Sequence, residues 1–178
     1  RKPDTLWVLQ EYANLCRRRG FREKAKEFYE KIVTRDYADA DARQSLIALA
    51  VDELRGEDAL GQYDTLIQLQ PLSIGLRLAK ARLYMQAEKY EDALAQCQAA
   101  LEICAENSSV YRLIGTVRQR QKQDAQAMEA WQTALKYDPD DKWLREYIEF
   151  LAPESIAAFD EYGVPAEEAE KIVAARAK

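Results

Sequence analysis

The sequence predicts an all-α protein assembled from helix–turn–helix repeats, and three observations lead to that prediction. The first is a set of four alanines spaced 34 residues apart: Ala25, Ala59, Ala93 and Ala127. A fixed period of this size is the mark of a repeat protein. The second is that Pro71 and Pro139 lie 68 residues apart, twice the period, so the position of the proline within the repeat is kept as well as the length of the repeat. The third is that large and small residues alternate in the same frame, as expected where two helices cross closely.

Each repeat is predicted to contain two helices. In the first repeat (6–39) they cover residues 4–18, capped by Asp4 or Thr5, and residues 21–34, with a break at Gly20. In the second repeat (40–73) they cover 41–54 and 57–69. Pro71 ends the latter helix, because proline cannot continue a helix and restricts the residue before it.

The next two repeats carry clearer capping residues. In the third repeat (74–107), Ser73 caps a helix that ends near residue 87, and a second helix covers 90–104. In the fourth repeat (108–141), Asn107 or Ser108 caps a helix to residue 121, and Asp124 caps one to residue 137. The sequence therefore predicts eight repeat helices.

One further helix, over 142–151 with Asp141 as its cap, follows the first-helix pattern without a second-helix partner. Its apolar residues are expected to cover the open end of the fourth repeat: Trp143, Leu144, Tyr147, Ile148 and Leu151. Repeat proteins need such a capping element at their ends. The remaining residues, 152–178, comprise an apolar segment (156–162), a helix stop at Gly163 and a helix over 166–177 that begins after Pro165. They are predicted to form a docked extension or a linker.

This pattern resembles the tetratricopeptide repeat (TPR) family. The best copies, 74–107 and 108–141, carry the matching positions Ala81, Tyr84, Tyr90, Ala93, Ala100, Tyr111, Gly115, Ala127, Trp131, Ala134 and Pro139. The second repeat departs from the family, since Arg43 stands where an aromatic residue is usual and its turn glycine is Gly56, displaced toward the alanine. The resemblance implies a TPR solenoid over 1–151, a right-handed α–α superhelix whose first helices line a concave groove.

A second resemblance covers residues 142–178. The run from Trp143 to Glu154, followed by Phe159 to Tyr162, is similar to the passage by which repeat regions of some bacterial proteins lead into a transglutaminase-like segment. It implies an alternative role as the structural or spacing region of a larger envelope protein, located in the periplasm or cell envelope. Because the chain begins at Arg1 without methionine, we expect it to be a piece of a longer polypeptide.

Composition argues against several functions. A net charge of −5 disfavours nucleic acid as a partner, and apolar runs far shorter than the ~18 residues of a spanning helix disfavour membrane insertion. The chain has no histidine and no C-x-x-C, G-x-S-x-G or P-loop motif, so we expect no enzyme activity, no metal and no cofactor. Cys97 and Cys104 are predicted seven residues apart on one helix, about 10 Å along its axis, too far for a disulfide. Cys16 and Cys97 are predicted to be buried in the protein core as free thiols. Free thiols favour a reducing compartment, which we expect to be the cytoplasm.

The predicted groove follows from the register. Residues 18, 15, 11 and 8 positions before each alanine form one stripe of the first helices: Trp7, Gln10, Asn14 and Arg17; Asp41, Gln44, Ala48 and Val51; Gly75, Leu78, Arg82 and Met85; Ser109, Arg112, Thr116 and Gln119. All of them except Trp7, Asp41, Ala48, Gly75, Ser109 and Gln119 are predicted partner contacts. The stripe is net +2, with three arginines against one aspartate, on a chain of −5.

The sequence therefore predicts a protein–protein interaction scaffold that binds a peptide with acidic groups in this groove. Arg82 and Arg112 are expected at neighbouring positions as its electrostatic anchors. In the chaperone-tail subgroup of the family, Lys and Asn residues clamp a terminal carboxylate. Here Asn14 fits one such position, but Gln10 and Ser45 replace the Lys and the second Asn, so no carboxylate clamp is expected.

Overall fold

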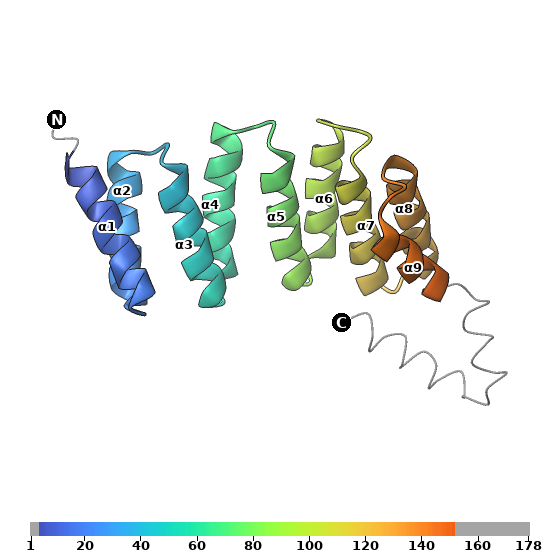
Figure 1. Cartoon of the computed structure of the whole chain (residues 1–178), viewed down its shortest axis with the longest axis horizontal. Coiled ribbons are helices and arrows are strands. Elements are labelled where there is room, and N and C mark those ends of the chain that lie inside the picture. The colour runs from blue at the N-terminus through green and yellow to red at the C-terminus, as the bar shows by residue number, and fades with distance from the viewer. Residues whose placement is uncertain (1–3, 152–178) are drawn as a thin grey trace, which may run out of the picture. The chain divides into compact units, whose positions relative to one another are not determined.

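The computed structural model describes residues 4–151, and in this part of the chain every regular element is a helix. The helices are α1 (Asp4–Arg18), α2 (Arg22–Arg35), α3 (Ala40–Asp52), α4 (Gly56–Leu69), α5 (Ile74–Gln86), α6 (Tyr90–Leu101), α7 (Ser108–Arg120), α8 (Asp124–Tyr137) and α9 (Lys142–Leu151). They follow one another as antiparallel pairs joined by short turns (Figure 1). The segments predicted at 156–162 and 166–177 lie outside the described residues.

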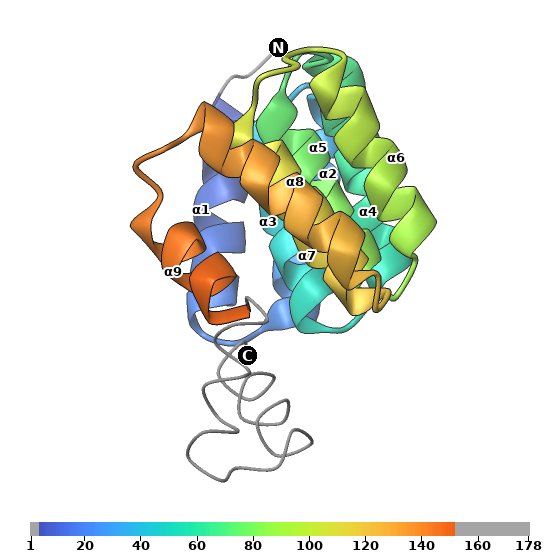
Figure 2. The same cartoon turned by 90° about the vertical axis from the view of Figure 1, so that its right-hand side faces the viewer.

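The chain divides into two compact units, Arg1–Ile103 and Cys104–Lys178. The first unit holds the three helix pairs α1–α2, α3–α4 and α5–α6, and the second holds α7, α8 and α9. Within the second unit, α9 lies beside α8, as the view along the molecule shows (Figure 2).

The helix boundaries agree with the predicted ones to within two residues, with one exception. The helix α6 ends at Leu101 instead of Cys104, because the chain leaves it through a tight turn in which Ile103 N donates to Ala100 O at 3.2 Å. Cys104 is therefore not on the same helix as Cys97, so the prediction that one helix holds both cysteines was wrong. Cys16, Cys97 and Cys104 are all free thiols.

Three of the predicted caps are present. The side chains of Ser73, Asn107 and Asp141 accept hydrogen bonds from the backbone N–H groups of Leu76, Val110 and Leu144, at 3.4, 3.1 and 3.0 Å. The prediction for Asp124 was wrong: it is the first residue of α8, and the preceding Gln123 makes no side-chain capping hydrogen bond.

The same type of turn joins the two helices of all four pairs. In the second repeat its position differs from the predicted one. The turn residue has a positive φ in each repeat: Gly20 (78°), Leu54 (57°), Glu88 (58°) and Lys122 (60°). These residues are 34 apart. In each turn the residue after it donates to the carbonyl five residues back, as Phe21 N does to Cys16 O at 2.9 Å, which defines a Schellman motif. Gly56 is instead the first residue of α4, so the left-handed position of the second repeat is filled by Leu54.

The core lies where the helices cross. The alanines that set the period, Ala25, Ala59, Ala93 and Ala127, are fully buried. At the α7–α8 crossing a Cβ added to Gly115 would overlap the Trp131 ring, so only glycine lets the indole lie against α7. The Trp131 Nε1–H then donates to Arg112 O at 3.2 Å. Small residues thus admit the large ones of the facing helix.

The helix α9 closes this second core with only part of its predicted apolar set. Leu144 is buried and packs with Ile148 and Leu151 against Ala127, Trp131 and Ala134 of α8. Trp143, by contrast, is 61% exposed and stacks on Tyr147 with ring centroids 5.1 Å apart. Trp143 therefore does not cover the end of the fourth repeat as predicted, because its position on α9 faces away from α8.

Arg43, which departs from the family pattern, is a buried structural residue. Its Nε and Nη2 donate to Tyr37 O at 2.9 and 2.8 Å, and Nη1 donates to Gln62 Oε1 at 2.8 Å. The guanidinium also lies over the Tyr37 ring, 4.4 Å from its centroid. A buried charge is tolerated when its donors are satisfied, so Arg43 joins α3 to α4 and to the preceding turn.

The shared turn gives the first prediction. Gly20→Ala should destabilise the protein by about 1 kcal/mol, because a Cβ is strained at a left-handed φ even though no atom lies within 4 Å of it. Gly61→Ala, in the exposed interior of α4, should stabilise it by roughly 0.5 to 1 kcal/mol through helix propensity. Urea unfolding midpoints measure both, and a stabilising Gly20→Ala would contradict the turn geometry.

The crossing alanines give the second prediction. Ala93→Leu should destabilise the protein by about 1 to 3 kcal/mol, because Ala93 is fully buried and the extra methylenes overpack the α5–α6 crossing. Ala95→Leu is the control, since Ala95 is exposed on the same helix. Equal shifts of the denaturation midpoint in the two variants would show that Ala93 is not at a crossing.

Candidate functional site

An open groove of about 460 Å³ lies between the first helices α1 and α3. It is lined by Gln10, Asn14, Arg17, Asp41, Gln44, Ser45 and Ala48. Four of the ten predicted partner contacts, Gln10, Asn14, Arg17 and Gln44, are thus brought together in one place. Six of the seven lining side chains are polar or charged, so the groove offers hydrogen-bonding groups more than apolar surface.

Asn14 is held in place at this groove by a residue of the second helix. The Tyr29 hydroxyl, fully buried in α2, donates to Asn14 Oδ1 at 2.7 Å, and Gln10 Nε2 donates to the same oxygen at 3.5 Å. Both bonds use Oδ1, and no side-chain hydrogen bond donated by the Nδ2 group of Asn14 is found within residues 4–151. An amide whose oxygen is occupied presents its N–H donors to a ligand.

Two opposite charges lie at different ends of the helices that form the groove. Arg17 is in the last turn of α1 and Asp41 is in the first turn of α3. Both are exposed, and neither has an ion-pair partner in the described part of the chain. The groove therefore has amides in its middle and a free guanidinium near one end.

The other predicted contacts of the first unit are placed differently. Val51 is exposed near the end of α3, Arg82 is exposed on α5, and Met85 is half-buried. Leu78 is only 6% exposed because its side chain is part of the core, and its role as an apolar contact in the groove stays a prediction. The structure does not join these residues to the groove between α1 and α3.

The two predicted contacts of the second unit are engaged within it. Arg112 Nη1 donates to Asp141 Oδ2 at 2.9 Å, so this guanidinium already has a carboxylate partner. Thr116 Oγ1 donates to Arg112 O at 3.0 Å on its own helix. Since Arg82 and Arg112 belong to different units, their predicted proximity stays a prediction.

Two groups with shifted pKa values, Cys97 and Tyr63, lie outside the set of residues that line the groove. Cys97 is buried on α6, and burial raises the pKa of its thiol to about 12 although the nearby Arg82 guanidinium opposes the shift. Burial likewise raises the pKa of Tyr63, again opposed by Arg82. Among residues 4–151 no cluster of metal-ligating side chains is present.

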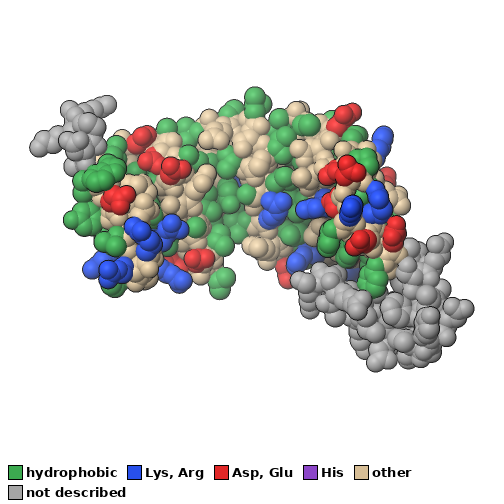
Figure 3. Space-filling model, in the orientation of Figure 1, with side chains coloured by type: hydrophobic (Ala, Val, Ile, Leu, Met, Phe, Trp, Pro, Cys, Tyr) green, Lys and Arg blue, Asp and Glu red, His purple; other side chains and the backbone are tan. Residues whose placement is uncertain are grey.

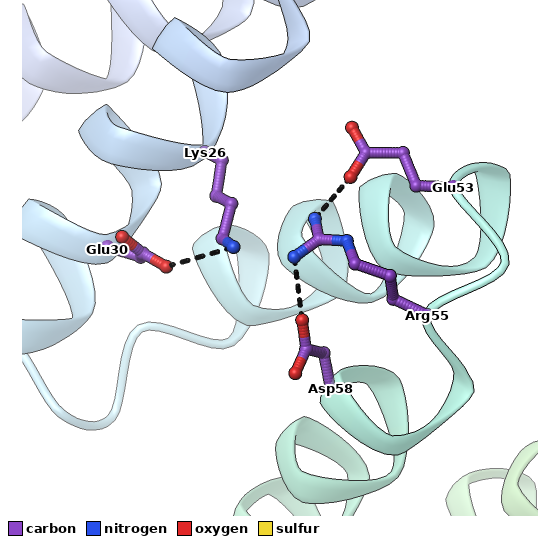
Figure 4. Close-up of polar contacts among 5 residues, drawn as sticks. All are labelled: Lys26, Glu30, Glu53, Arg55 and Asp58. Atoms are coloured by element: carbon purple, nitrogen blue, oxygen red, sulfur yellow. Dashed lines mark hydrogen bonds and ion pairs between the residues drawn. The ribbon is translucent and has the colours of Figure 1, made fainter.

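A second hollow, of about 360 Å³, is lined by residues of α2, α3 and α4 and by Arg55, and its charged lining residues are Lys26, Glu30, Arg55, Glu57 and Asp58. Figure 4 shows ion pairs made by Lys26, Glu30, Arg55 and Asp58, and Glu57 pairs with Lys89 at 2.7 Å. Arg55 binds both Glu53 and Asp58, the latter at 2.7 Å, and Lys26 lies 3.8 Å from Glu30. Because its ions already have partners, this hollow is a weaker candidate for ligand binding than the groove between α1 and α3.

Neither a family model nor a curated protein sequence matches the chain. Solved structures do match it. YrrB, described as a TPR protein with an unusual peptide-binding site, matches with a TM-score of 0.63 and 16% identity over 82% of this chain and 75% of that chain. TTC0263, a TPR protein of Thermus thermophilus, matches with a TM-score of 0.59 and 18% identity over 83% and 81%. A MamA RS-1 double mutant matches with a TM-score of 0.67 and 19% identity over 96% and 97%.

The described helices have the TPR fold. This confirms the all-α TPR solenoid that the resemblance implied. The transglutaminase-like resemblance stays a prediction, because only the 10 residues of α9 within that stretch are described. Each helix between residues 4 and 151 is too short or too polar to cross a lipid bilayer.

The sequence analysis missed two features of the groove. Ser45 lines it, and Tyr29 positions Asn14 from behind. Ser45 lies one residue beyond the predicted stripe position Gln44, so a wider stripe would have included it. Tyr29 is the tyrosine four residues after Ala25, and only the fold shows that its hydroxyl reaches between the first helices.

The cysteines give the third prediction. At pH 8 Cys97 should not react with a thiol reagent such as DTNB, because it is buried and a thiol with a pKa of about 12 stays protonated at that pH. The exposed Cys104 should react within minutes. Peptide mapping after labelling distinguishes the two sites. Labelling of Cys97 at the rate of Cys104 in the folded protein would contradict its placement in the core.

Proposed function

We propose that this protein is a protein-interaction module that binds an extended peptide segment in the groove between α1 and α3. The observation that carries the proposal is that Gln10, Asn14, Arg17 and Gln44, selected by their register alone, line one open polar groove. A surface of amides matches the donors and acceptors of a peptide backbone. The likeness of the fold to that of YrrB, described as having a peptide-binding site, supports it.

The side chains that line the groove indicate how such a peptide is recognised. Asn14 offers its Nδ2 donors to a backbone carbonyl, and Gln44 can both donate and accept, so these side chains bind the main chain without regard to sequence. Arg17 has no ion-pair partner within residues 4–151 and supplies a charge-assisted contact to an acidic side chain. We therefore propose a peptide with at least one carboxylate near the Arg17 end.

The proposed preference of the groove for acidic peptides depends on Arg17 more than on the two arginines that the sequence predicted as electrostatic anchors. Arg112 is bound to Asp141, and its recruitment by a ligand would require that ion pair to open. Arg82 is exposed, but it lies on α5, outside the groove between α1 and α3. A carboxylate bound by Arg17 needs neither of them.

The fourth prediction tests this function. Peptides selected from a displayed random library on the folded protein should be enriched in Asp or Glu, and the best of them should lose about ten- to hundredfold in affinity with Asn14→Ala or Arg17→Ala, by isothermal titration. Tyr29→Phe should weaken binding in the same direction, because Asn14 then loses the hydrogen bond that positions it.

The matched control is Arg22→Ala, which removes an exposed arginine from the first turn of α2 without touching the groove. It should bind the selected peptides as tightly as the unsubstituted protein does. If Arg22→Ala and Arg17→Ala lose affinity equally, or if no variant of the groove changes binding, the peptide site is elsewhere.

A further inference from the structure

The groove between α1 and α3 carries opposite charges at its two ends. The two helices run in the same direction, because each is the first helix of an antiparallel pair (Figure 1). Asp41 is in the first turn of α3 and Arg17 is in the last turn of α1, and both line the groove. Figure 3 shows acidic side chains near the start of α3 and basic side chains near the end of α1. The groove is therefore acidic at one end and basic at the other.

The carboxylate of Asp41 has no structural task in the described part of the chain. Three aspartates lie between the end of α2 and the first turn of α3. Asp36 and Asp39 accept hydrogen bonds from backbone N–H groups two and three residues further on, at 3.0 and 2.8 Å. Asp41 is exposed and makes neither a hydrogen bond nor an ion pair within residues 4–151. Its carboxylate is thus available to a ligand in the groove.

An exposed indole lies at the same end of α1. Trp7 is one turn before Gln10 on the same face of the helix, and Gln10 lines the groove. Trp7 also occupies the position of Asp41 one repeat earlier, so the two are equivalent residues of neighbouring first helices. The indole is 69% exposed. The face of an indole and a carboxylate both attract a basic side chain, the first through a cation–π interaction and the second through an ion pair.

The distance between the two ends sets the spacing of the charges on a ligand. Arg17 is ten residues beyond Trp7 on α1, which is about 15 Å along the helix axis. An extended peptide advances about 3.3 Å per residue, and its alternate side chains point to the same side. Side chains four residues apart therefore lie about 13 Å apart on one face of the peptide, and the long Arg17 side chain can cover the remaining distance. Spacings of two or six residues, about 7 or 20 Å, do not match the groove.

We propose, on the basis of the function proposed above for this groove, that its ligand is an extended peptide segment with a basic and an acidic side chain four residues apart. The basic side chain binds Asp41 and Trp7, and the acidic side chain binds Arg17. The amides of Asn14 and Gln44 bind the main chain between them. A segment whose charges all have one sign places a like charge at one end of the groove, so such segments are bound more weakly.

The test uses the tightest peptide selected on the folded protein from the displayed random library, synthesised with both ends blocked. We expect this peptide to carry Lys or Arg four residues from its Asp or Glu. In isothermal titration, Asp41→Asn and replacement of the basic peptide residue by Gln should each lower the affinity about three- to tenfold. The two changes together should cost no more than either alone, because they remove the same contact. Trp7→Leu should be coupled to the basic peptide residue in the same way.

The matched control is Asp92→Asn, which removes an exposed carboxylate from the first turn of α6, outside the groove. It should bind the peptide as tightly as the unsubstituted protein does, and circular dichroism should show unchanged helix content in every variant. Asp41→Asn should also be additive with replacement of the acidic peptide residue, which binds Arg17 at the other end. Moving the basic peptide residue to a spacing of two or six should cost as much affinity as removing it.

The proposed function and this inference fail in different ways. If Asn14→Ala and Arg17→Ala weaken binding but Asp41→Asn does not, the groove binds peptides and the basic subsite is overturned. The same holds if the losses from Asp41→Asn and from the basic peptide residue are additive, or if the spacing of the two charges has no effect. If the library yields no binder, or if no variant of the groove changes binding, the proposed function fails and this inference fails with it.

Discussion

The close approach of paired helices at a buried alanine is the contact on which the rest of this structure depends. Ala25, Ala59, Ala93 and Ala127 have no accessible surface, so each crossing is packed to the limit that a methyl group allows. This close approach of the two helices of a pair lets a large side chain of the second helix reach between the first helices. Tyr29 thereby meets Asn14, and Trp131 meets the backbone of α7.

The turn between the paired helices fixes their geometry at a cost. Each repeat reverses direction through the same Schellman hydrogen bonds, but only Gly20 is suited to the left-handed conformation that they require. Leu54, Glu88 and Lys122 adopt it with a strain of about 1 kcal/mol each. The packing of the crossing that follows every turn is large enough to offset this strain, since a well-packed helix crossing buries several apolar side chains.

The same position in the repeat can be core or surface, depending on its neighbour. Leu46 in α3 is buried by α2, whereas Tyr12, its equivalent in α1, is half exposed within the described unit. Conversely, Leu78 belongs to the predicted groove stripe by register and is buried. The groove between α1 and α3 is polar because six of its seven lining side chains are polar or charged. The burial of equivalent positions therefore differs from one repeat to the next.

The sequence by itself determined the repeat period, the helix boundaries except the end of α6, and the caps Ser73, Asn107 and Asp141. These features are local: a cap acts within three residues, and a period records which face of each helix is buried. Register also placed six of the seven residues that line the groove in the predicted stripe, and four of these six were predicted partner contacts.

Only the tertiary structure decided how individual side chains are used. It paired Arg112 with Asp141, enclosed Arg43 between Tyr37 and Gln62, and set Tyr29 behind Asn14. These partners lie 29, 6, 19 and 15 residues apart along the chain. A period identifies equivalent positions, but the partner of a polar side chain depends on which residues packing brings within about 3 Å, and that distance is fixed only when the helices cross.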